Sequence, residues 1–302
     1  MSVLVTGGAG FIGSNLVEDL LNSGEDVTVM DNLSTGSLDN LKDLDGCLEV
    51  VKADCSDLFE LDIHIDAIYH IGIPSSSQIY RRDPFLVGDS INEMIAILEL
   101  AKKEGCRVVY AASSSVYGDL TPPHQEDMRI RVTDYYTEAR LCMERLADLY
   151  ETFFSVKSVG MRFFSVYGPK ERAKGVYANI VTQFLWEIME GKRPLIYGDG
   201  SQTRDFVYVK DVVRALRLAM NSNYHGILNV GTGKSYSFNE VVQVLNEKMN
   251  TDLQPEYDEN PIRNYVMHTL ADTSRAKEVL DFESQFALRE GIDELVEHYL
   301  RR

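Results

Sequence analysis

Three glycines at positions 7, 10 and 13 constrain the fold of this chain more than any other feature. They lie in the run TGGAGFIG at residues 6–13, between an apolar run and an amphipathic stretch. Glycine lets the backbone turn tightly and approach a pyrophosphate closely, while the N-terminus of the following helix supplies N–H groups and partial positive charge. The run therefore predicts a strand, a phosphate-binding turn and a helix.

An acidic residue after the next predicted strand supports a nucleotide site at this turn. A carboxylate at Asp31, directly after the run VTVM, can accept hydrogen bonds from both ribose hydroxyls of an adenosine and would repel a 2′-phosphate. Asp54 follows the third strand and is placed to reach the adenine edge. We therefore predict NAD as the cofactor. The alternative to a nucleotide site is that the glycines only make a tight strand-to-helix turn and that Asp31 only acts as a capping residue.

The rest of the chain predicts a Rossmann-type, doubly wound α/β fold. Short β-branched runs alternate with amphipathic stretches, which is typical of a parallel sheet covered by helices. We expect strands at residues 3–6, 26–30, 48–51, 67–71, 107–112 and 156–162, and helices at 12–22, 86–104 and 136–152. Glycine-rich loops after Tyr167 predict a smaller C-terminal substrate lobe. The predicted NAD-binding domain comprises residues 1–163 with 205–231, and the sugar-nucleotide lobe comprises 164–204 with 232–302.

Charge and composition limit the partners. The 302 residues carry 30 Lys and Arg against 47 Asp and Glu, and this net charge of −17 repels phosphate backbones and anionic lipids. We therefore expect neither nucleic acid nor a membrane surface as partner. We also expect no membrane-spanning helix, because no apolar run reaches the roughly 18 residues that such a helix needs. The four cysteines and six histidines show no ligand spacing, which predicts no metal site and reduced thiols in the cytoplasm.

Several motifs resemble those of the extended short-chain dehydrogenase/reductases. Besides TGGAGFIG these are DNLSTG at residues 31–36, SSSVYG at 113–118 and Tyr136-x-x-x-Arg140, and the runs RFFSVYGP at 162–169 and GDGSQTRDFVYVKD at 198–211 look like the family's sugar-nucleotide lobe. The resemblance implies an NAD that is reduced and reoxidised within one catalytic cycle. The expected cofactor contacts are Gly7, Gly10, Phe11, Ile12, Gly13, Asp31, Asn32, Ser34, Gly36, Asp54, Cys55, Ile71, Tyr136 and Arg140.

By the same resemblance, Tyr136 is the general base that removes a sugar hydroxyl proton, and Ser113 hydrogen-bonds the same oxygen. A phenol with a pKa of about 10 is a poor base at neutral pH, so it needs a nearby cation. Arg140 lies one helical turn later on the same face. Most of the family has lysine there, and the planar guanidinium cannot copy an ammonium that bonds two ribose hydroxyls from one point. Either the site has adapted to arginine or its activity is low.

The position two residues after Ser113 favours epimerisation. Dehydratases and decarboxylases of the family usually carry glutamate there, whereas this chain has Ser115, which cannot take a proton from carbon in the same way. We expect a nucleotide-sugar epimerase of the UDP-glucose/UDP-galactose 4-epimerase type. The run GPKERAKG at 168–175 instead resembles ADP-heptose 6-epimerases, in which Lys174 would be a second acid/base rather than a surface or phosphate-binding lysine. A third interpretation is a catalytically weak relative that binds NAD and a nucleotide.

The predicted substrate contacts come from loops and from the second lobe. Arg204 follows a glycine-rich turn, and its guanidinium matches diphosphate oxygens at two points. The alternative for Arg204 is a surface ion pair. The full set is Ser75, Ser115, Ser165, Tyr177, Asn179, Arg204 and Arg263. By resemblance, helices 86–104 and 136–152 pack against their copies in a homodimer.

Overall fold

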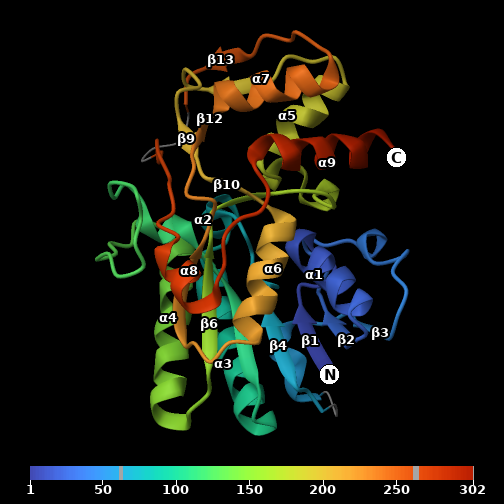
Figure 1. Cartoon of the computed structure of the whole chain (residues 1–302). Coiled ribbons are helices and arrows are strands. Elements are labelled where there is room, and N and C mark those ends of the chain that lie inside the picture. Colours follow the sequence, from blue (N-terminus) through green and yellow to red (C-terminus); the bar gives the residue numbers. More distant parts are fainter. Residues whose placement is uncertain (61–63, 261–264, 302) are drawn as a thin grey trace.

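A seven-stranded parallel sheet forms the centre of the molecule in the computed structural model, which describes residues 1–60, 64–260 and 265–301 (Figure 1). The spatial order is β11-β6-β5-β4-β1-β2-β3. The chain order reverses between β1 and β4, and a crevice forms at such a point outside the carboxyl ends of the strands. The strands are β1 (Ser2–Thr6), β2 (Asp26–Met30), β3 (Leu48–Val51), β4 (Ala67–His70), β5 (Arg107–Ser113), β6 (Ser158–Phe163) and β11 (Gly226–Val230).

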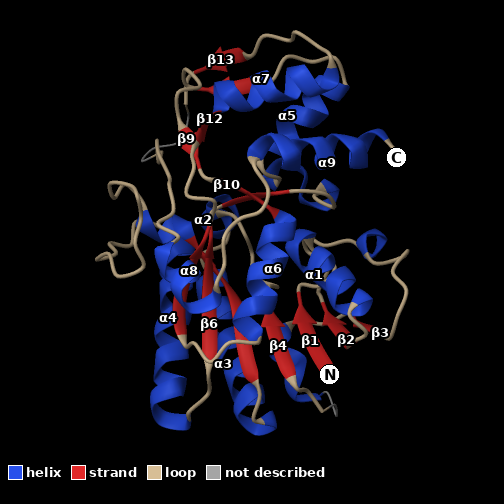
Figure 2. Cartoon of the chain, in the orientation of Figure 1, coloured by secondary structure: helices blue, strands red, loops and turns tan. Residues whose placement is uncertain are grey.

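Helices cover both faces of this sheet (Figure 2). On one face α1 (Phe11–Asn22) packs beside α6 (Val209–Met220), and on the other α3 (Leu86–Glu104) packs beside α4 (Tyr135–Phe154). The short α2 (Ser77–Arg82) contacts α4. The predicted Rossmann-type fold is thereby confirmed.

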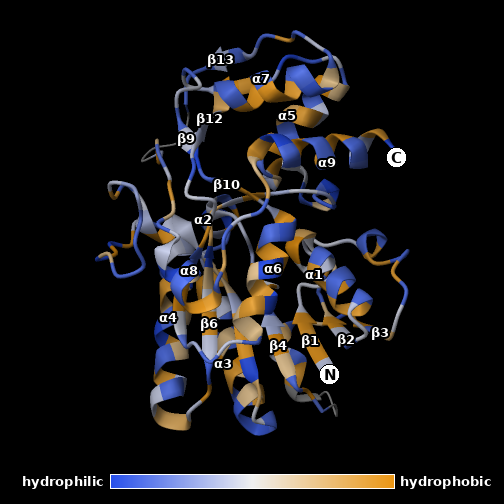
Figure 3. Ribbon diagram, in the orientation of Figure 1, coloured by the Kyte–Doolittle hydropathy of each residue, from blue (hydrophilic) through white to orange (hydrophobic). Residues whose placement is uncertain are grey.

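The core lies where the strands meet the apolar faces of the helices. Strands β4 and β6 are buried at every residue, as expected for parallel strands that are covered on both sides. In α6, Val209, Val212 and Leu216 are buried, whereas the neighbouring Lys210 is exposed. Figure 3 shows this as apolar colour along the strands and alternating colour on the helices.

A smaller lobe lies beyond the carboxyl ends of the strands (Figure 1). Strands β7 (Ser165–Tyr167) and β10 (Phe206–Tyr208) pair with each other at its base, and β11 returns to pair with β6. Within residues 205–231, β10 therefore lies outside the main sheet, whereas β11 joins it. The lobe contains α5 (Ile180–Met189), α7 (Phe238–Met249), α9 (Leu288–Leu300), β8 (Leu195–Tyr197), β9 (Thr203–Arg204), β12 (Tyr236–Ser237) and β13 (Glu256–Asp258), while α8 (Ser274–Leu280) contacts β11.

Candidate active site

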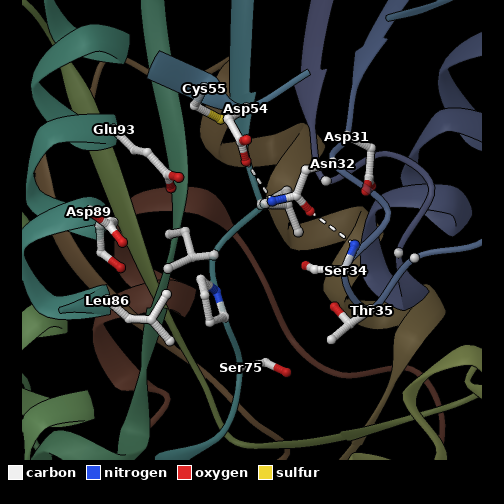
Figure 4. A pocket seen from close by; sticks show the side chains of 18 of the residues that line it. Asp31, Asn32, Ser34, Thr35, Asp54, Cys55, Ser75, Leu86, Asp89 and Glu93 are labelled. Carbon is white, nitrogen blue, oxygen red and sulfur yellow. Dashed lines mark hydrogen bonds between the residues drawn. The ribbon is translucent and has the colours of Figure 1, made fainter. Parts of the chain in front are cut away.

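A cavity of about 770 Å³ opens at the carboxyl ends of the central strands (Figure 4). The glycine turn forms one wall, and the loops after β2, β3 and β4 and the first turns of α3 form the others. The predicted cofactor contacts outside α4 all line it, namely Gly7, Gly10, Phe11, Ile12, Gly13, Asp31, Asn32, Ser34, Gly36, Asp54, Cys55 and Ile71.

The glycine turn is packed too closely for side chains. A Cβ added to Gly7, whose φ is +68°, would lie 2.3 Å from the Cα of Gly72, and one added to Gly13 would lie 2.1 Å from the carbonyl oxygen of Gly7. Helix α1 begins after Gly10 without a side-chain cap and without an acidic residue in its first turn. Helix N–H groups left in this way favour an anion, so the turn fits the pyrophosphate of a dinucleotide.

Asp31 holds the turn and still faces the cavity. Its carboxylate accepts hydrogen bonds from the backbone N–H groups of Ala9 at 2.9 Å and Leu33 at 2.8 Å. Each carboxylate oxygen has a second lone pair, so ribose hydroxyls can bind there as well. Asn32 donates to Asp54 at 2.6 Å and joins the ends of β2 and β3 (Figure 4). These residues fit the adenosine end of NAD.

Glu93 also lines the cavity, and the sequence analysis did not identify it. Its Oε2 atom is buried and has no hydrogen-bond partner among the residues that the structure describes. Burial raises the pKa of this carboxyl to about 7, helped by repulsion from Asp54 and Asp89 and opposed by Arg140. The sequence contains a signal for this position. Glu93 lies three residues after Ser90 and so on the same face of the helix, and that inner face is otherwise uncharged.

Tyr136 and Ser113, the predicted base and its partner, are not part of the cavity lining. Tyr136 lies in the first turn of α4 and is 7% exposed, and its ring packs edge-on against Tyr80 with centroids 5.6 Å apart. Leu86 packs against this cluster and also lines the cavity, so Tyr136 stands next to the cavity wall. The Ser113 hydroxyl oxygen accepts a hydrogen bond from the Ser115 N–H.

Arg140 is buried under the same wall. Its guanidinium lies 4.9 Å from the centroid of the Tyr136 ring, and it donates to the carbonyl oxygens of Ala111 at 3.0 Å and Pro74 at 2.9 Å. It therefore ties α4 to the end of β5 and to the loop after β4. Burial, with a smaller contribution from Arg140, lowers the pKa of His70 to about 3, so this histidine is neutral.

Two of the predicted substrate contacts, Ser75 and Tyr177, line the cavity together with Lys174. The Lys174 ammonium lies 5.2 Å from the centroid of the Phe11 ring and donates to the buried Glu171 carboxylate at 3.1 Å. The Tyr177 hydroxyl accepts a hydrogen bond from Arg82. Lys174 is thus held beside the glycine turn.

The remaining predicted substrate contacts lie elsewhere. Asn179 caps α5, and Arg204 donates to the carbonyl oxygens of Thr203 and Met267 and packs against the rings of Phe238 and Tyr265. Ser165 lies in β7 and Ser115 in a short 3-10 helix after β5. Arg263 lies outside the described residues.

Between residues 1 and 301, outside 61–63 and 261–264, no group of three or more His, Cys, Asp and Glu side chains could hold a metal ion. Within those ranges, each helix is too short or too polar to cross a bilayer.

A family model named the NAD dependent epimerase/dehydratase family matches residues 3–231, the part that contains the glycine turn and most of the cavity. The chain belongs to this family. Its cofactor is NAD, as predicted, and it is an enzyme of the epimerase type.

Relatives match over the whole length of the chain. UDP-glucuronic acid decarboxylase 6 of Arabidopsis thaliana is 32% identical over 312 residues, covering 100% of this chain and 90% of the relative. The UDP-glucose 4-epimerase of Thermotoga maritima, solved with UDP-glucose, has a TM-score of 0.93 at 30% identity and covers 100% and 99%. The ADP-L-glycero-D-manno-heptose-6-epimerase of Helicobacter pylori has a TM-score of 0.88 at 29% identity and covers 100% and 96%.

Proposed function

We propose that the substrate is a UDP-linked hexose and that the reaction is of the UDP-glucose/UDP-galactose 4-epimerase type. The observation that carries this proposal is the full-length structural match to a UDP-glucose 4-epimerase, at a TM-score of 0.93. The similarity to a decarboxylase is of comparable extent, and Ser115 decides between the two. A hydroxyl at this position does not provide the carboxylate that dehydration and decarboxylation use.

The chain's own residues have separate tasks in this proposal. NAD held at the glycine turn would supply hydride transfer from the sugar and back to its opposite face. The Tyr136 phenolate accepts the sugar hydroxyl proton and the resulting phenol gives it back, and Ser113 hydrogen-bonds the same oxygen. The guanidinium of Arg140 lies 4.9 Å from the centroid of the Tyr136 ring and places a positive charge beside the base. The glycine turn and Asp31 hold the cofactor so that it stays bound through the cycle.

Turnover of UDP-glucose and UDP-galactose without added NAD tests this function, with product followed by chromatography. Tyr136→Phe is expected to lower the rate by at least about 100-fold, because the proton acceptor is lost, while NAD stays bound. Tyr135→Phe is the matched control, because Tyr135 is the adjacent residue and is exposed. A Tyr136→Phe rate equal to that of the control would remove Tyr136 from the mechanism.

A heptose 6-epimerase is the second candidate, and the place of Lys174 in the cavity wall favours it. In that case ADP-heptose turns over, and Lys174→Met abolishes this turnover because the second acid/base is lost. A 4-epimerase would keep most of its rate in the same variant. Failure of all these sugar nucleotides, despite bound NAD, would instead support a binding protein without turnover.

The cellular setting and the assembly are also proposed. The four cysteines, all within the described residues, are unpaired, and this supports a reducing compartment such as the cytoplasm.

The pairing of β11 with β6 supports the division into an NAD-binding domain of residues 1–163 with 205–231 and a lobe of 164–204 with 232–302. A homodimer through α3 and α4 is proposed on the exposed apolar side chains of α4, which packs beside α3.

A further inference from the structure

Glu93 is a titratable side chain of the cavity to which the proposed chemistry assigns no role. It extends from α3 toward Asp54 and Cys55, at the end of the cavity that receives the adenosine (Figure 4). Its buried Oε2 atom has no partner among the described residues. A buried polar atom of this kind costs free energy unless a ligand satisfies it.

The charged and titratable groups around Glu93 come from several elements. Asp54 and Cys55 face it from the segment after β3, Asp89 from its own helix, Tyr80 from α2 and Arg140 from α4. Burial is the main cause that raises the pKa of Glu93 to about 7, the two aspartates add to it, and Arg140 opposes it. Near neutral pH the neutral carboxyl is therefore well populated.

A neutral carboxyl offers one O–H donor and one carbonyl acceptor side by side. Adenine presents the complementary pair, an exocyclic amine hydrogen and a ring nitrogen, on two edges, which amide side chains recognise in the same two-point way. Asp54 can therefore reach one edge while Glu93 binds the other. An ionised carboxylate offers acceptors alone and would be repelled by nearby Asp54. The protonated form therefore fits adenine better than the ionised form.

We propose that Glu93, in its neutral form, recognises the adenine base of the dinucleotide, so that NAD binding takes up a proton. The inference rests on NAD as the cofactor and does not depend on the identity of the sugar. Because the bound state holds the proton that free Glu93 loses as the pH rises through 7, NAD affinity falls with increasing pH. Above about pH 7 the loss approaches tenfold per pH unit.

Calorimetric titration of nucleotide-free protein with NAD tests this at about pH 6 and about pH 8.5, where Glu93 is mostly neutral and mostly ionised. Glu93→Gln carries the donor and acceptor permanently, so we expect it to bind with similar affinity at both pH values. Glu93→Ala is expected to bind about tenfold more weakly even at the lower pH, because the two-point contact is lost. Glu99→Gln is the matched control, since Glu99 lies on the same helix but does not line the cavity, and it should leave the NAD affinity and its pH dependence unchanged.

ADP-ribose, which lacks nicotinamide, locates the contact. It is expected to show the same pH dependence as NAD and the same loss in Glu93→Ala, because both ligands carry adenine. A pH dependence that persists in Glu93→Gln, or full affinity in Glu93→Ala, would overturn the proposal. A loss confined to NAD would place Glu93 at the nicotinamide and overturn it as well. None of these binding measurements uses a sugar nucleotide. They can therefore be interpreted even if the epimerase assay fails.

Discussion

Arg140, predicted to act at the catalytic site, also has a structural role. Its two terminal nitrogens donate to the backbone carbonyls of Ala111 and Pro74, and its charge lies over the ring of Tyr136. The planar fork of arginine suits two carbonyls that lie in different directions, whereas a single ammonium does not. We therefore propose an adapted site rather than a weakened one.

The substitution Arg140→Lys tests this adaptation. At least one of the two buried carbonyls would lose its donor, so the free energy of unfolding is expected to fall by about 1–3 kcal/mol. Urea unfolding measures the change as a lower midpoint with an unchanged slope. Arg145→Lys, on the exposed face of the same helix, should leave the midpoint unchanged. Equal midpoints for both variants, with faster turnover in Arg140→Lys, would identify arginine as a compromise.

Individual contacts were predictable where local sequence determines them. Asp31 and the glycines follow from their spacing to predicted strands, and the structure places them in one cavity. The pKa of Glu93 was not predictable, because burial and the approach of Asp54 depend on tertiary packing. The carbonyl partners of Arg140 belong to segments far away in sequence. Its structural role could therefore not be predicted from the sequence either.

At the scale of elements, the N-terminus of α4 positions the proposed base. Asp134 accepts a hydrogen bond from the Thr137 N–H at 2.8 Å in a capping box, and its other oxygen accepts one from the Ser77 hydroxyl at 2.7 Å. The same carboxylate thus begins α4 and attaches α2 to it. Tyr136 lies between the cap and Thr137, so its orientation depends on this cap.

Asp134→Ala is expected to lower the free energy of unfolding by about 0.5–2 kcal/mol, the usual cost of a lost cap. Turnover should fall as well, by up to about 100-fold, because small displacements of a catalytic group are costly. Ser237→Ala removes the cap of α7 in the other lobe and should destabilise similarly without changing turnover. Equal turnover in the two variants would show that the α4 cap has only a structural role.

The main elements were predictable because their periodicity is strong, whereas the small lobe was not. Predicted helix 86–104 matches α3, which ends at Gly105 with a φ of 68°. Strands such as β9 and β12 have two residues each and are held by pairing across the lobe. Segments this short carry no period, and their pairing arises only after the lobe has folded.

For the whole molecule, α3 and α4 pack side by side as one outer layer (Figure 1), and α4 exposes apolar side chains to solvent. Leu149 and Phe153 lie one turn apart on α4, and Phe153 is 70% exposed. A second copy that packed against this layer would cover both side chains. The charge of −17 opposes such an approach, so added salt should strengthen the association by screening.

Sedimentation equilibrium tests this assembly, with a dimer as the expected species for the unmodified chain. Phe153→Ser is expected to weaken the dimer by about tenfold or more, since large aromatic side chains contribute most to interfaces. Tyr257→Ser is the control, because Tyr257 is also an exposed aromatic residue but lies in the other lobe. A monomer at every concentration would contradict the homodimer, and equal weakening by both substitutions would place its interface elsewhere than on α4.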